Sequence, residues 1–153
     1  MRKNQKGFSL IELLIVVAII LIIAAIAIPN LIKSKMAANE SSAVGSLRTL
    51  NTAEVGFASQ CPDVGFADTL GKLGGTAGDC AAIGLIDSTL SSGTKSGYNF
   101  AIGGTTGTPV TTYTFTAIPV STSSGKRNFF TDQTGVIRYS ARGAANADSE
   151  PIR

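Results

Sequence analysis

A long apolar run near the amino terminus constrains the fold of this chain more than any other feature. Residues 8–32 contain one charged side chain, Glu12, and are otherwise mostly aliphatic. As an α-helix this run would be about 37 Å long, which is enough to cross a hydrocarbon layer of about 30 Å. The sequence therefore predicts a membrane-spanning helix at residues 8–32.

The distribution of charge predicts how this helix is oriented. Arg2, Lys3 and Lys6 precede the apolar run and account for the net charge of +3, because the other ten basic residues balance ten acidic ones. Positive charge before a span keeps that end in the cytoplasm. We therefore expect the amino terminus inside and the carboxyl-terminal part outside. Because the excess of positive charge lies in residues 1–7, we expect no specific nucleic-acid site.

The residue types also exclude several kinds of chemistry. The chain has no His and no Trp among its 153 residues. A Ser-His-Asp or Cys-His hydrolytic site and a His-containing zinc site are therefore excluded. We expect a protein that is not an enzyme and that has no cofactor and no metal site.

A cleaved secretory signal peptide is the alternative interpretation of the amino terminus. The basic start, the apolar run and the small-residue triplet at residues 25–27 all fit one. The run is longer than the roughly 7 to 15 apolar residues of a signal peptide. Glu12 would also cost several kcal/mol in the membrane, and a signal peptide has nothing to compensate it. We therefore favour a helix that stays in the mature protein.

The amino-terminal pattern resembles the signal of type IV pilins and type II secretion pseudopilins. It consists of a basic leader ending in Gly7, then Phe8, Glu12 four residues later, the long apolar run, and Pro29 near its end. Ser9 stands where the family often has Thr. The resemblance implies that residues 1–7 are a leader, that a prepilin peptidase cleaves between Gly7 and Phe8, and that the new Phe8 amine is N-methylated.

This cleavage would give Glu12 a role in subunit assembly. A carboxylate in apolar surroundings needs an opposite charge, and cleavage would create an ammonium at Phe8 on every subunit. We predict that Glu12 of an incoming subunit pairs with the Phe8 amine of a subunit already in the array, which would set the stagger between subunits. The alternative is a carboxylate that reaches back to the cytoplasmic interface without a partner.

The helix is expected to change character after the apolar run. Pro29 lacks an N–H and is predicted to kink the helix, with Asn30 helping to accommodate it. Residues 33–60 are predicted to form an amphipathic half that packs on the chain's own sheet. Its apolar stripe, at steps of three and four residues, consists of Val44, Leu47, Leu50, Ala53 and Phe57.

The two cysteines lie in the segment after this helix. Cys61 and Cys80 would close a loop of about twenty residues, and outside the cytoplasm we expect them to form a disulfide. A two-cysteine metal or redox site is the alternative, but no His accompanies them and their spacing is not C-x-x-C. Residues 61–92 are therefore predicted to be a disulfide-closed connecting loop with one or two short helical turns.

Apolar residues in the last third of the chain recur with a period of two, which is typical of strands. The predicted strands lie at about residues 98–102, 112–117, 127–131 and 136–140. Residues 132–135, Asp-Gln-Thr-Gly, read as a turn with Gly135 in the left-handed region; a calcium site there would lack neighbouring carboxylates. Residues 93–153 are thus predicted to form an antiparallel sheet of three to four strands and a tail.

Two segments in this part, residues 93–98 and 128–139, also resemble major pilins. The resemblance implies the α+β pilin fold, in which a long amino-terminal helix packs on a small antiparallel sheet. It also implies a structural subunit of a type IV pilus filament, which serves adhesion, twitching motility or DNA uptake. The alternative is a type II secretion pseudopilin in a short periplasmic fibre, which bound calcium would favour. A membrane-anchored enzyme or sensor is a third possibility, disfavoured by the lack of catalytic side chains.

The resemblance further implies where the chain resides and what it contacts. It would span the inner membrane once, with its amino end inside, and then become part of an extracellular pilus on the cell surface. Its partners would be other copies of itself in a helical filament, the prepilin peptidase and the inner-membrane pilus assembly machinery. Membrane lipid would surround residues 8–32 before assembly.

Overall fold

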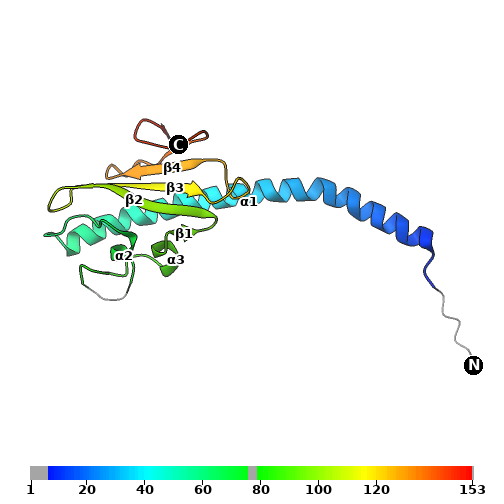
Figure 1. Cartoon of the computed structure of the whole chain (residues 1–153), viewed down its shortest axis with the longest axis horizontal. Coiled ribbons are helices and arrows are strands. Elements are labelled where there is room, and N and C mark those ends of the chain that lie inside the picture. Colours follow the sequence, from blue (N-terminus) through cyan, green and yellow to red (C-terminus); the bar gives the residue numbers. More distant parts are fainter. Residues whose placement is uncertain (1–6, 76–78, 153) are drawn as a thin grey trace, which may run out of the picture. The chain divides into compact units, whose positions relative to one another are not determined.

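The computed structural model describes residues 7–75 and 79–152 (Figure 1). The chain divides into two compact units, residues 1–35 and 36–153. Helix α1 (Leu10–Gln60) begins in the first unit and ends in the second. The second unit also contains the short helices α2 (Leu70–Leu73) and α3 (Ser88–Ser91) and a six-stranded sheet. The basic residues Arg2, Lys3 and Lys6 lie outside the described part of the chain.

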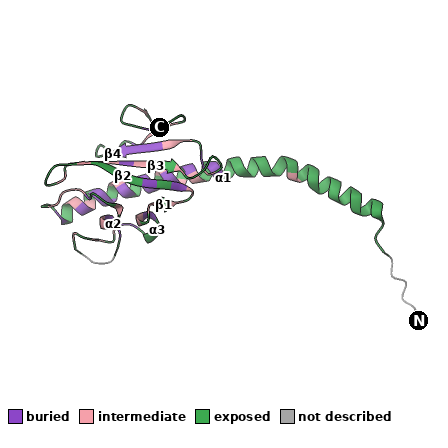
Figure 2. Cartoon of the chain, viewed as in Figure 1, coloured by how far each residue is buried: buried purple, intermediate pink, exposed green. Residues whose placement is uncertain are grey.

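The first unit consists of the apolar part of α1. Its described residues are exposed, except for the half-buried Ala24 (Figure 2). Among the described residues, α1 is the helix that is long and apolar enough to cross a membrane, judged by length and composition. A helix that is apolar on all sides belongs in a membrane or among other apolar helices.

The sheet is a meander in which each strand pairs antiparallel with the next one along the chain. The predicted α+β fold, a long helix packed on a small antiparallel sheet, is confirmed, but the sheet has six strands rather than three to four. The additional ones, β1 and β6, have two residues each, which is too short to show a period of two. The strands are β1 (Thr94–Lys95), β2 (Tyr98–Thr106), β3 (Thr112–Pro119), β4 (Asn128–Asp132), β5 (Arg138–Ser140) and β6 (Glu150–Pro151).

The predicted alternation along the strands is confirmed most clearly in β3. Tyr113, Phe115 and Ala117 are buried, whereas the threonines between them are half-buried. The buried face of the sheet packs against α1 in one hydrophobic core. Because successive strand residues point to opposite faces, the same alternation that positions these aromatic residues fixes the register of the sheet on the helix.

The second half of α1 supplies the other side of this core. The predicted stripe is confirmed at Leu47, Leu50, Ala53 and Phe57, which are buried and pack with the aromatic residues of the sheet. Val44 is the exception: it is half-buried, and the neighbouring Ala43 is buried in its place.

The connector, residues 61–92, is attached to the rest of the second unit by both covalent and backbone contacts. The predicted disulfide between Cys61 and Cys80 is confirmed. The Phe66 N–H donates to the Val110 carbonyl at 3.0 Å, and the Val110 N–H donates to the Val64 carbonyl at 2.8 Å. Gly65 lies between them with φ of +81°, and a Cβ there would collide with the Val110 backbone. The connector is therefore held against the β2–β3 loop.

Replacing both cysteines, Cys61→Ser with Cys80→Ser, is expected to lower the free energy of unfolding by about 3 kcal/mol, because the loop-closure entropy of the unfolded chain returns. The core residues of α1 and the sheet lie outside the loop, so the native circular dichroism spectrum should be retained. Denaturant unfolding of the full chain in detergent, compared with the disulfide-bonded protein, measures the difference. An unchanged unfolding midpoint would contradict a stabilising role for the disulfide.

The last part of the chain is fixed by hydrogen bonds. The predicted turn is confirmed: Gly135 has φ of +74°, and its N–H donates to the Asp132 carbonyl at 2.9 Å. Beyond it, β6 pairs with β5, and the Ile152 N–H donates to the Ile137 carbonyl at 2.9 Å. The tail is thus a strand of the sheet rather than a loose end.

Candidate functional site

The candidate site is the amino-terminal end of α1, where the expected cleavage position lies. Gly7 and Phe8 precede the helix, and Phe8 is 86% exposed. The helix begins at Leu10, and the Leu13 N–H donates to the Ser9 carbonyl at 3.2 Å. The Gly7–Phe8 peptide bond therefore lies in non-helical, exposed chain before the first turn of α1.

Glu12 caps the helix to which it belongs. Its Oε2 accepts a hydrogen bond from the Ser9 N–H at 3.1 Å. A glutamate three residues after a serine N-cap forms one half of a capping box, and its negative charge also suits the amino end of a helix. Sequence reasoning missed this contact, although the S-x-x-E spacing of residues 9–12 is its signal. Pairing of Glu12 with a Phe8 amine involves a second copy and stays a prediction.

Pro29 lies within α1, which is helical on both sides of it. Because proline has no N–H, the Ala25 carbonyl lacks its usual helical donor. The next residue, Asn30, donates from its Nδ2 to the Ile26 carbonyl at 3.1 Å. The kink at Pro29 stays a prediction.

Glu40, in the second half of α1, joins the helix to the start of β4. Its Oε2 accepts a hydrogen bond from Arg127 Nε at 2.7 Å, and its Oε1 accepts one from the Lys126 N–H at 2.9 Å. Burial alone would raise the pKa of Glu40, but these hydrogen bonds and the Arg127 charge outweigh it and lower the pKa. Glu40 is therefore ionised at neutral pH.

Glu54 is the more unusual of the two buried glutamates. Its side chain is fully buried, and its Oε2 accepts a hydrogen bond from the Ala67 N–H at 2.8 Å. Its Oε1 has no hydrogen-bond partner among the described residues. Burial raises the pKa of Glu54 to about 7, against the lowering effect of the Ala67 hydrogen bond and with a further raising effect of Asp68.

Sequence reasoning missed both glutamates, although the spacing carries a signal. Positions 40, 43, 47, 50, 54 and 57 follow one another at steps of four and three, so both glutamates lie on the apolar stripe. Asn51, on the same helix, contacts the sheet. Its Nδ2 donates to Thr131 Oγ1 at 2.9 Å, and its Oδ1 accepts from the Tyr113 hydroxyl at 3.3 Å.

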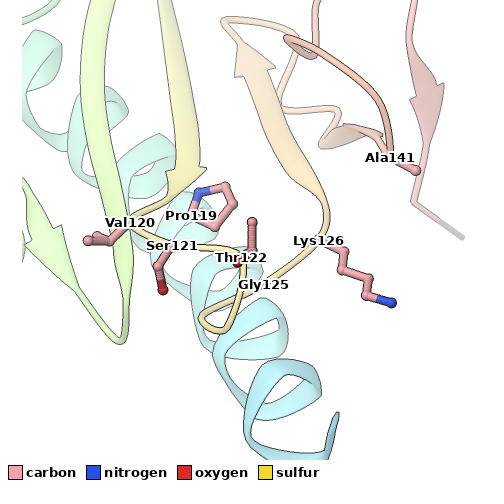
Figure 3. Close-up of a pocket in the computed structure, with 7 residues that line it drawn as sticks. All are labelled: Pro119, Val120, Ser121, Thr122, Gly125, Lys126 and Ala141. Carbon is pink, nitrogen blue, oxygen red and sulfur yellow. The ribbon is translucent and has the colours of Figure 1, made fainter. Parts of the chain in front are cut away.

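The described residues hold no group of three or more His, Cys, Asp or Glu side chains that could bind a metal ion. An open surface pocket of about 570 Å³ lies beside the β3–β4 loop (Figure 3). The Ser121 hydroxyl in this pocket bonds with the hydroxyls of Ser123 and Ser124 rather than with a base. The lining residues are Pro119, Val120, Ser121, Thr122, Gly125, Lys126 and Ala141.

Comparison with known proteins connects the amino-terminal geometry to a family. A family profile described as the prokaryotic N-terminal methylation motif matches residues 2–28. The type IV major pilin protein PilA of Myxococcus xanthus is 44% identical over 89 residues, which cover 50% of this chain and 40% of that protein. The matched motif and this similarity support a type IV pilin.

Two further pilins match shorter segments of the chain. The type IV wide pilus major component PilA4 of Thermus thermophilus is 59% identical over 39 residues, covering 26% of this chain and 30% of PilA4. The type IV major fimbrial protein FimA of Dichelobacter nodosus is 54% identical over 52 residues, covering 32% of this chain and 33% of FimA. The chain thus spans two fifths or less of the length of these relatives. No solved structure matches it.

Proposed function

We propose that this pilin is a structural, non-enzymatic subunit of a type IV pilus filament. The exposed apolar surface of residues 8–32 supports this role most directly. Outside a membrane this surface would face water unless the helices of other copies covered it. Burial stabilises such an array by about 25 cal/mol for each Å² of apolar surface removed from water. The similar proteins are named as major components of type IV pili and fimbriae, which supports a pilus rather than a secretion fibre.

Processing would precede assembly. A prepilin peptidase would cleave between Gly7 and Phe8, and the new Phe8 amine would be methylated. The exposure of both residues and their position before the first helical turn support access by a peptidase. The mature chain would remain in the inner membrane with its amino end inside. The pilus assembly machinery would then supply the energy that moves the apolar helix from lipid into the filament.

Glu12 would set the stagger between neighbouring subunits. In the single chain its Oε2 is occupied by the Ser9 N–H, which leaves Oε1 for the Phe8 amine of a neighbouring subunit. Cleavage does not remove the Ser9 N–H, so the cap and the intersubunit pair are compatible. A carboxylate in an apolar array is costly without a cation, and misaligned subunits would therefore be disfavoured.

Mass spectrometry of the mature amino terminus tests the processing step. We expect the protein purified from sheared filaments to begin at Phe8 and to carry one additional methyl group on its amine. The matched sample is the same protein from cells that lack the prepilin peptidase, which should retain residues 1–7 and form no filaments. A mature chain that begins at Ile28, after the 25–27 triplet, would instead indicate a conventional signal peptide and overturn the proposal.

A further inference from the structure

The contact between Glu54 and the connector has an unusual construction. Glu54 lies on the core face of α1, and its carboxyl group is the point at which the Ala67 N–H of the connector is hydrogen-bonded. Both Glu54 and Ala67 have no exposed surface. One carboxyl oxygen is satisfied by this bond, whereas Oε1 has no partner among residues 7–75 and 79–152. An unpaired charge in such a place costs far more than a neutral carboxyl group.

Among the described residues, the side chain whose charge acts on this carboxyl is an acid and not a cation. From the connector, the charge of Asp68 acts on Glu54 and opposes its ionisation, while Lys72 is engaged with Asp68 at 2.9 Å. From β3, the hydroxyl of Tyr113 is the titratable group that senses Glu54, and burial, Glu54 and Asp132 raise the pKa of Tyr113 to about 12. Tyr113 therefore stays neutral, and ionisation of Glu54 would leave a carboxylate facing a second acid.

We propose that Glu54 is a proton-sensitive latch between α1 and the connector. In its neutral form it holds the Ala67 segment against the helix. In its ionised form the buried charge is relieved when this segment moves out and admits water, because α1 and β3 are fixed in the core. The Cys61–Cys80 disulfide and the Val64–Val110 and Phe66–Val110 hydrogen bonds remain, so the opening is local. This property of the second unit does not depend on filament assembly.

The direction of the pH dependence follows from the folded-state pKa. The pKa of Glu54 is raised from 4.5 to about 7, so the folded chain holds the proton more tightly than the unfolded chain does. The stabilisation is therefore complete below the unfolded value and is lost as the pH rises through about 7. Each unit of pKa difference corresponds to about a tenfold change in the opening equilibrium.

Amide hydrogen exchange of the full chain in detergent micelles tests the latch. The protection factor of the Ala67 amide, corrected for intrinsic exchange, is compared at about pH 5.5 and about pH 8.5. We expect it to fall at least about tenfold. The Phe66 amide, which is bonded to the Val110 carbonyl, is the internal reference and should change less than about twofold. An Ala67 protection factor that is constant with pH would overturn the proposal without any variant.

Two matched substitutions on the same helix identify the titrating group. Glu54→Gln retains an oxygen that accepts the Ala67 N–H but cannot ionise, so its Ala67 protection should not depend on pH. Glu40→Gln removes the other buried glutamate and should leave the Ala67 response as in the unsubstituted chain. The same loss of protection in Glu54→Gln would assign the response to another group. A Glu54 carboxyl carbon resonance that titrates near pH 4.5, its ordinary value, would also overturn the latch.

Discussion

Glu12→Gln is expected to abolish filament assembly while leaving cleavage at the Gly7–Phe8 bond intact. Glutamine retains an oxygen that can accept the Ser9 N–H, so the helix cap should remain. It loses the charge that would pair with the Phe8 amine of a neighbouring subunit. Because removing one partner of a buried ion pair costs about 3–5 kcal/mol, the filament yield should fall by at least about a hundredfold. The ratio of pilin in sheared filaments to pilin in the membrane measures it.

The distinction between pairing and capping needs two companion variants. Ser9→Ala alters the N-cap side chain but retains the Glu12 charge, and it should leave filament yield nearly unchanged. Glu12→Ala removes both contacts and should assemble as poorly as Glu12→Gln. All three should begin at Phe8 by mass spectrometry. Normal filaments from Glu12→Gln would show that the cap, and not the charge pair, is what assembly requires.

Phe57→Ala is expected to cause the largest loss of stability in the second unit, about 3–5 kcal/mol. Phe57 is fully buried in the core between α1 and the sheet, and its removal leaves a cavity that the surrounding aromatic residues cannot fill. Domains are stable by only about 5–15 kcal/mol, so much of the folded population should be lost. Denaturant unfolding of the full chain in detergent measures the change.

Val55→Ala is the matched control, because Val55 lies two residues away on the same helix and is 61% exposed. It should change the unfolding free energy by less than about 0.5 kcal/mol. Similar effects of the two substitutions would mean that the core does not lie on the Phe57 face of α1. Retention of the circular dichroism signal of the helix in both variants would separate loss of packing from loss of the helix.

The sequence predicted those parts of the fold that are encoded locally. Each of three patterns is visible within one short segment of the sequence: the apolar run, the stripe from Leu47 to Phe57, and the alternation in β3. The disulfide was predictable because the chain has only two cysteines. The two-residue strands β1 and β6 were not, since they exist through backbone pairing with a neighbouring strand rather than through a pattern of their own.

The candidate site also contains residues that the sequence predicted and residues that it did not. Gly7, Phe8 and Glu12 form a compact motif that can be recognised without a structure. Glu40 is buried with Arg127, 87 residues away, as its hydrogen-bond partner. Glu54 is buried with the backbone N–H of Ala67, in the connector, as its partner. Such partners leave no periodic trace in the sequence. The partner of Glu12 in a filament belongs to another copy, so neither the sequence nor the structure of one chain contains it.

The meander topology has a consequence for the order in which the sheet can form. Each strand hydrogen-bonds to the strand that follows it in the chain, so every pairing can form as soon as its second strand has been synthesised. No early strand has to wait for a distant one, and few edges stay unpaired while synthesis continues. Two sets of contacts join segments far apart in the chain: the docking of the sheet onto α1, and the hydrogen bonds of Val64 and Phe66 with Val110. In both, the earlier segment is already made when its later partner forms.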